Sequence, residues 1–245
     1  GAVFAAYPAF VTATGWVARQ DLILATFFTV TALYAFIAYD AVGGRRRSIA
    51  AYTWAIILHV FGLLTQPQLA LSLPFLLLVA MWWRRQHHGG IGAGHMGRCL
   101  PFFGLSVLGL AGLYATHVFG PAPAADGVSW LTQVAEAGWL NFFLLYKAVL
   151  PANQNIVYPL RADLLPGFLR FLPLLVWIAL LALLWLLRRR EVANGLFAAA
   201  AVFSATLLAV LLVPDYEVLQ YGLSADHWNY PGAGVMAVAA VCGLG

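Results

Sequence analysis

The stretch FLRFLPLLVWIALLALLWLLRRR, which runs from Phe168 to Arg190, decides the fold. Its apolar part is close to the roughly 20 residues that a helix needs to cross the hydrocarbon core of a bilayer. Backbone groups in lipid must be hydrogen-bonded within their own segment, and the run lacks the alternating polar pattern of a barrel strand. We therefore predict a membrane-spanning helix from Phe168 to Leu187 that ends at the arginine triplet Arg188–Arg190.

The rest of the chain repeats this pattern. Hydrophobic residues make up 63% of the sequence and charged residues only 9%, which is far from the composition of soluble domains. Two shorter apolar stretches lie between Ser48 and Trp83, and the polar Thr65–Gln68 between them predicts a helical hairpin, with re-entrant arms as an open alternative. Further runs of spanning length are Asp21–Tyr39, Cys99–Val118, Asn194–Val213 and Trp228–Gly245.

These runs together predict the fold class. We expect an all-α polytopic membrane protein in which residues 1–245 form a single transmembrane domain of about 7 to 8 spanning helices, some of them partial. Because the chain begins and ends within apolar stretches, we expect it to be a fragment of a longer protein.

The arginine clusters predict how the helices are oriented. Positive residues near the ends of short loops are normally retained in the cytoplasm. If Arg45–Arg47 is cytoplasmic, strict alternation places Arg84–Arg85 and Arg188–Arg190 on the same side, and most acidic residues then fall outside. The net charge of +4 is therefore a topology signal. The arginines are dispersed as helix anchors, so they indicate no nucleic-acid partner.

The longest segment between spanning runs, residues 119–167, falls on the outer face. Ser129 is placed to cap a helix whose Trp139 and Tyr146 suit the headgroup region, so we predict an amphipathic helix on the outer leaflet. The polar side of this helix consists of Gln133, Glu136, Asn141 and Lys147. The amide- and aromatic-rich residues 150–160 that follow are either a surface loop or part of a carbohydrate-binding site.

Several polar residues invite a functional interpretation of their own. His59 and His117 each lie in an apolar run, where imidazole is either hydrogen-bonded within the bundle or a ligand of haem or chlorophyll; we predict the hydrogen-bonded role. Asp21 beside Arg19 is either an ion pair at a helix start or a catalytic carboxylate. The two cysteines have no companion at metal-ligand spacing, so neither a metal site nor a disulfide framework is predicted.

Four short motifs follow one another along the chain. They are FAAYP with GWVARQDLI (Phe4–Pro8, Gly15–Ile23), LLTQP with LPFLL (Leu63–Pro67, Leu73–Leu77), YKAVLP with YP (Tyr146–Pro151, Tyr158–Pro159) and ADHWNYPG (Ala225–Gly232). In order, spacing and membrane side they resemble the GT-C membrane glycosyltransferases related to the transmembrane and tetratricopeptide-repeat O-mannosyltransferases and their bacterial relatives. The corresponding signatures of that family read FALHP...A.WVSGRxDLL, LLSKE...LPLLLL, YLKLLLLPxxLsxxYP and AERYLYLPS.

The resemblance implies a GT-C-like helix bundle that transfers a sugar from a polyprenyl-phosphate carrier to an acceptor on the non-cytoplasmic side. A carboxylate must orient or deprotonate the acceptor, while polar and basic groups stabilise the departing lipid phosphate. The family carries its key acidic residues in the first outer loop, which would precede Gly1, so we expect the catalytic base upstream of this chain. A divalent cation is the one cofactor kept as a candidate.

The resemblance also implies partners and a location. The expected partners are membrane lipid, the polyprenyl-phosphate sugar as donor, and either a protein acceptor or a larger membrane complex. The bacterial relatives imply an inner membrane with the arginine-rich loops in the cytoplasm. The candidate residues of the donor-phosphate pocket are Asp226, His227, Tyr230, Lys147, Arg161, Gln66 and Arg19.

The chain departs from the family at charged positions. Gln66-Pro67 stands where the family hairpin has Lys-Glu, and Asp226-His227 stands where it has Glu-Arg. A histidine replaces the permanent, bidentate charge of arginine with one that depends on protonation. These changes leave a second interpretation open: a catalytically silent, GT-C-derived structural subunit of a larger membrane complex.

Overall fold

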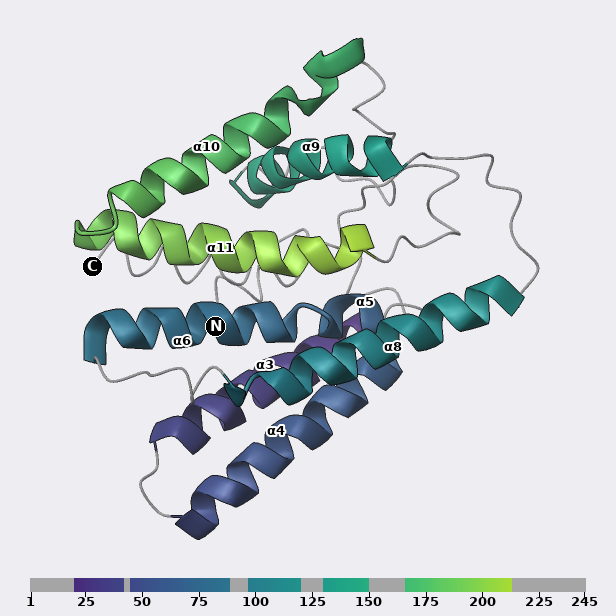
Figure 1. The fold of residues 1–245 in the computed structure, drawn as a ribbon, viewed down its shortest axis with the longest axis vertical. Helices are drawn as coiled ribbons and strands as arrows, with labels where there is room; N and C mark the ends of the chain where they lie inside the picture. The colour runs from purple at the N-terminus through teal and green to yellow at the C-terminus, as the bar shows by residue number, and fades with distance from the viewer. Residues whose placement is uncertain (1–19, 42–44, 89–96, 120–129, 150–165, 213–245) are drawn as a thin grey trace. The chain divides into compact units, whose positions relative to one another are not determined.

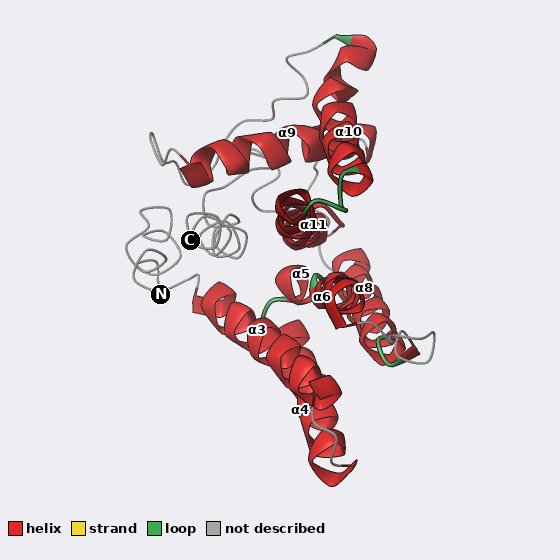
Figure 2. Cartoon of the chain, turned by 90° about the vertical axis from the view of Figure 1, so that its left-hand side faces the viewer, coloured by secondary structure: helices red, strands yellow, loops and turns green. Residues whose placement is uncertain are grey.

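The computed structural model describes residues 20–41, 45–88, 97–119, 130–149 and 166–212 (Figure 1). Within these ranges every regular element is a helix, as Figure 2 shows. The predicted all-α fold is therefore confirmed for the described part of the chain. The predicted spanning run Trp228–Gly245 lies outside the described residues.

The chain packs as two compact units, of which one comprises residues 18–122. The other comprises residues 1–17 and 123–245. In the first unit the helices are α3 (Gln20–Ala41), α4 (Arg45–Thr65), α5 (Pro67–Ala70), α6 (Leu73–His88) and α8 (Leu100–Phe119). The two long helices α3 and α4 pack against each other, while α6 and α8 complete the unit.

The core of this unit lies where α3, α4, α6 and α8 meet. Phe36 of α3 packs edge to face against Phe102 of α8, with ring centroids 5.6 Å apart. Both side chains are buried together with Ala55 of α4 and Leu77 of α6. Interiors of this kind are close-packed, so these four helices form one body.

The predicted hairpin between Ser48 and Trp83 is present as the helix–turn–helix segment α4–α5–α6. Gln66 connects α4 to the single turn of α5, which begins with Pro67. Proline suits the first turn of a helix because its fixed φ is already helical and its missing N–H would be unsatisfied there. The polar tip of the hairpin therefore has a defined backbone.

The second unit contains α9 (Trp130–Val149), the 3₁₀ helix η4 (Gly167–Phe171), α10 (Leu172–Leu186) and α11 (Glu191–Leu212). The turn 187–190 joins α10 to α11, and the two helices pack as an antiparallel pair (Figure 1). Helices were expected over Phe168–Leu187 and Asn194–Val213, and both expectations are confirmed apart from the 3₁₀ turn at the start of α10.

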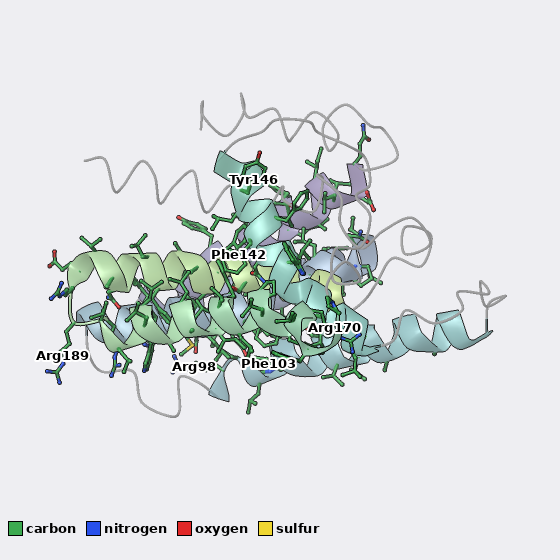
Figure 3. All side chains as sticks on the ribbon, turned by 90° about the horizontal axis from the view of Figure 1, so that it is seen from above. Arg98, Phe103, Phe142, Tyr146, Arg170 and Arg189 are labelled. Atoms are coloured by element: carbon green, nitrogen blue, oxygen red, sulfur yellow. The ribbon has the colours of Figure 1, made fainter. Side chains whose placement is uncertain are left out.

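The helix α9 crosses the α10–α11 pair steeply. In Figure 2, where α11 is seen nearly end-on, α9 runs across the view, and Figure 3 also shows it running transverse to both helices. Leu140 and Leu144 of α9 are buried against Trp177 of α10 and Phe203 of α11. The apolar face that we expected to lie on the outer leaflet is therefore partly covered by protein.

Among the described residues, two helical segments are long and apolar enough to cross a membrane, namely Gln20–Tyr39 and Gly167–Leu186. They differ in how much protein covers them. About a third of the first segment is buried inside the structure (33%), but only 6% of the second is. Because apolar helices of this length are typical of membrane proteins, the two segments indicate association with a membrane.

Candidate functional site

The residues predicted from the sequence for the donor-phosphate pocket are only partly described. Gln66 and Lys147 lie within the described ranges, and each belongs to a different unit. The other candidates lie outside the described residues: Arg19, Arg161, Asp226, His227 and Tyr230. The predicted pocket as a whole is therefore not tested by the structure.

Gln66 lies at the tip of the α4–α5–α6 segment. Its backbone N–H donates to the carbonyl of Gly62 at 2.9 Å, which closes the last turn of α4. Its own carbonyl accepts from the N–H of Ala70 at 3.2 Å, which closes α5. The side chain makes no capping hydrogen bond to α5. The backbone of Gln66 is thus fixed by the two helices that it joins.

Lys147 lies in the last turn of α9, which ends at Val149. Tyr146, immediately before it, is exposed at the same end of α9, where Figure 3 labels it.

A buried polar cluster, not predicted from the sequence, lies where α9 crosses α10 and α11. The indole Nε1–H of Trp177 donates to Ser204 Oγ at 2.9 Å. The Ser204 hydroxyl lies 2.8 Å from the carbonyl of Ala200 and 3.5 Å from Asn141 Oδ1. We call Asn141, Trp177 and Ser204 the crossing cluster. It links one polar side chain from each of the three helices.

Asn141 requires a correction. The helical pattern placed it on the polar side of an interfacial helix, but it is only 6% exposed and faces Ser204 of α11. An amide can be buried at low cost only when it is hydrogen-bonded, and Ser204 offers a partner on the neighbouring helix. The pattern could not show this, because the partner lies 63 residues further along the chain.

Gly138 explains how α9 comes close enough for these contacts. A Cβ atom added at position 138 would lie 2.5 Å from Leu174 Cα and 2.7 Å from Leu174 Cβ. Real Cβ atoms do not come so near backbone, so the crossing point accepts only glycine without displacement. Small residues at helix crossings permit such close approach in membranes.

Arg170 in η4 supplies a permanent positive charge next to α9, against which η4 packs. Its guanidinium lies 5.0 Å from the ring centroid of Phe171. Its Nε is buried and has no hydrogen-bond acceptor among the described residues. The sequence prediction did not include Arg170 in the pocket.

The first unit holds a second buried polar group. His59 is 1% exposed, and its Nε2 lies 3.1 Å from Ser106 Oγ and 3.3 Å from the carbonyl of Phe102. The prediction of a hydrogen-bonded bundle histidine is therefore confirmed for His59. A carbonyl only accepts, so the contact with Phe102 requires Nε2 to carry the proton. The side chain of His117, the other predicted bundle histidine, lies outside the described residues.

Metal ligands do not cluster in the described ranges, which contain no group of three His, Cys, Asp or Glu side chains placed to hold an ion. Cys99 is buried, with its Sγ 3.2 Å from the Sδ of Met81. It packs in the core of the first unit.

Comparisons of the chain with protein-family models, with curated proteins and with solved structures found no match. The motifs in the sequence and the geometry described above are therefore the grounds for a functional proposal.

Proposed function

We propose that this chain is part of a GT-C type membrane glycosyltransferase that uses a polyprenyl-phosphate-linked sugar on the non-cytoplasmic face. The observation that carries the proposal is the succession of four motifs, in family order, from Phe4 to Gly232. The bundle would span the membrane several times, with the arginine clusters in the cytoplasm of a bacterial cell.

The exposure of α10 supports the membrane part of the proposal. The segment Gly167–Leu186 is almost entirely apolar and hardly covered by protein. Large side chains point outward along it, among them Leu175, Ile178 and Leu183. A soluble protein would leave this face in water, whereas lipid tails solvate it without penalty.

The placement of α9 supports the proposed orientation. It contacts α10 at Leu174 and Trp177 and α11 at Phe203 and Ser204, all in the halves of these helices that lie away from the Arg188–Arg190 turn. If the arginines are cytoplasmic, α9 lies toward the outer surface.

The first unit supports the same orientation. The helix α4 begins at Arg45 and ends at Thr65, next to Gln66. Its apolar part, Ile49–Thr65, corresponds to roughly 25 Å, near the short end of what crosses a hydrocarbon core, and the three arginines precede it. With Arg45–Arg47 in the cytoplasm, the tip at Gln66 reaches the outer surface.

The proposed chemistry needs cations and hydrogen-bond donors for the carrier phosphate. Lys147 at the end of α9 and Arg170 in η4 belong to the same unit and would both lie on the outer side. A guanidinium binds phosphate through two parallel N–H groups, so Arg170 could supply the permanent charge that His227 lacks. Asp226 would then orient the acceptor or the sugar.

The experiment uses the full-length protein in proteoliposomes with two probes. The first is radiolabelled polyprenyl phosphate, which tests carrier binding whatever the sugar is. The second is a polyprenyl-phosphate donor with radiolabelled mannose, because the motifs resemble O-mannosyltransferases. We expect saturable binding of the first and transfer of label from the second to membrane proteins, both weakened by Asp226→Ala and His227→Ala. Absence of binding to the wild type would contradict the proposal.

A second candidate is the silent structural subunit, and the hairpin tip favours it. Where the family has a charged Lys-Glu pair, Pro67 begins α5 and the backbone of Gln66 closes the adjoining turns of α4 and α5. Gln66 and Pro67 therefore serve to join α4 to α5, which is a structural role. In that case the wild type would bind no carrier, and purification in mild detergent would yield it in fixed stoichiometry with other membrane proteins. Purification as a lone, active monomer would exclude this candidate.

A further inference from the structure

The turn between α10 and α11 carries three consecutive arginines, Arg188, Arg189 and Arg190, and Glu191 follows them at the start of α11. Figure 3 shows Arg189 extending away from the end of the two helices. Arg189 and Arg190 are exposed, and neither is in an ion pair with another described residue. The turn is therefore a concentrated positive charge.

Trp185 holds Arg188, the first arginine of the turn, against the end of α10. Its ring lies 5.3 Å from that of Phe197 on α11, and the guanidinium of Arg188 lies 4.2 Å from its centroid. Arg188 also donates from Nη1 to the Trp185 carbonyl at 3.0 Å, and its backbone N–H donates to the same carbonyl at 3.3 Å. Arg188 is thereby held at the end of the helix, while its two neighbours project beyond it.

The charge is continuous with the uncovered apolar face of α10. Leu183, Leu186 and Leu187 are exposed just before the arginines. An aromatic side chain and arginines at the end of such a helix lie at the headgroup level. A phosphodiester there would meet several guanidinium donors, and its acyl chains would meet leucines.

We propose that the Arg188–Arg190 turn binds the headgroups of anionic phospholipids and concentrates them beside α10. The proposal rests on the membrane-spanning α10 of the proposed function, but it concerns the opposite end of that helix and no sugar donor. A free anion would use the guanidinium groups and none of the exposed leucines, so a lipid is the partner that fits both halves of the surface.

The test uses full-length protein in phosphatidylcholine vesicles that contain small, stepwise increasing fractions of a lipid brominated on its acyl chains. The headgroup of this lipid is either phosphatidylglycerol or phosphatidylcholine, and bromine quenches nearby tryptophan. The difference in fluorescence between wild type and Trp185→Phe isolates Trp185. We expect the brominated phosphatidylglycerol to quench Trp185 as effectively as about fivefold more brominated phosphatidylcholine at low ionic strength.

Three arms decide the outcome. The triple variant Arg188→Gln, Arg189→Gln, Arg190→Gln should abolish the preference, whereas the matched triple lysine variant should keep most of it. Sodium chloride should weaken the preference in wild type by screening. Inorganic phosphate should do no more than sodium chloride of equal ionic strength.

Equal quenching by the two lipids in wild type would overturn the proposal, and so would a preference that survives the triple glutamine variant. Displacement by phosphate beyond the salt effect would show an anion site in place of a lipid site. Extraction of the vesicles with alkaline carbonate separates these failures from failure of the proposed function. A protein that is extracted does not span the bilayer, whereas one that stays inserted without a headgroup preference contradicts only this inference.

Discussion

Gly138 of α9 lies directly against the backbone of Leu174 in α10. A methyl group at position 138 would come within 2.5 Å of Leu174 Cα, a distance that real Cβ atoms do not adopt. This contact sets the depth at which α9 crosses the α10–α11 pair. It therefore controls the distance between Asn141 of α9 and the other two members of the crossing cluster, Trp177 and Ser204.

Gly138→Ala is expected to destabilise the second unit. The added methyl meets backbone, which cannot rotate away, so α9 must move and the hydrogen bonds of the crossing cluster must stretch. Overpacking of this kind costs about 1–3 kcal/mol or more. The melting temperature of the purified protein in detergent, followed by circular dichroism, should fall by several degrees.

Gly195→Ala on α11 is the matched control for this substitution. A Cβ at Gly195 would meet nothing within 4 Å. Alanine is favoured over glycine within a helix by about 0.5–1 kcal/mol, so this variant should melt at the same temperature or higher. Equal melting temperatures for both variants would show that the crossing is not tight.

The positions of the helices could be predicted from the sequence, because hydrophobic length is a local property. The run Asp21–Tyr39 became α3, which extends it by one residue before and two after. The contact between Gly138 and Leu174 could not be predicted in this way. It depends on which helices meet and at what angle, and neither is encoded in the periodicity of α9 alone.

Ser204→Ala is expected to weaken the crossing cluster. The indole N–H of Trp177, a residue that is only 4% exposed, would lose its acceptor. Hydrogen bonds between helices in membrane proteins contribute about 0.6 kcal/mol on average and up to about 1.7. A double-mutant cycle with Trp177→Phe, measured by thermal unfolding, should give a coupling energy in this range. Additive effects of the two substitutions would mean that the bond contributes nothing.

Ser106→Ala is expected to have a smaller effect, because His59 Nε2 keeps the carbonyl of Phe102 as an acceptor. We expect a loss below about 1 kcal/mol in the presence of His59. In a His59→Leu background the same substitution should have almost no effect on the melting temperature, since the imidazole contact is already absent. A loss of equal size in both backgrounds would show that Ser106 acts without His59.

The candidate site was less predictable than the fold, and the reason differs from residue to residue. His59 could be anticipated, because an imidazole within an apolar run needs a partner in the bundle. Ser204 could not, because a serine in an apolar run also bonds to its own helix, as its contact with Ala200 shows. Arg170 could not be singled out, because one arginine near the start of an apolar run is equally typical of a helix anchor at the membrane surface.

Arg170→Gln is expected to raise the KM for the polyprenyl-phosphate donor about tenfold or more while changing kcat less. The reason is that the guanidinium is proposed to hold the carrier phosphate equally in the ground state and in the transition state. Arg170→Lys should restore part of the affinity, since it keeps the charge but loses the bidentate geometry. Thr53→Ala, on an exposed turn of α4, is the control. Unchanged donor affinity in Arg170→Gln would remove Arg170 from the pocket.

Cysteines introduced one at a time should show that positions 66 and 189 lie on opposite sides of the membrane. In a background without native cysteines (Cys99→Ala, Cys242→Ser), Arg189→Cys tests the turn that is proposed to be cytoplasmic, and Gln66→Cys tests the tip that is proposed to reach the outer surface. A membrane-impermeant maleimide added to intact cells should label position 66 and not position 189, and inverted vesicles should give the reverse. The proposal depends on this sidedness, because the polyprenyl-linked sugar is met only at the outer surface. Labelling of both positions from the same side would contradict the orientation read from the arginine clusters and would move Gln66 away from the proposed donor.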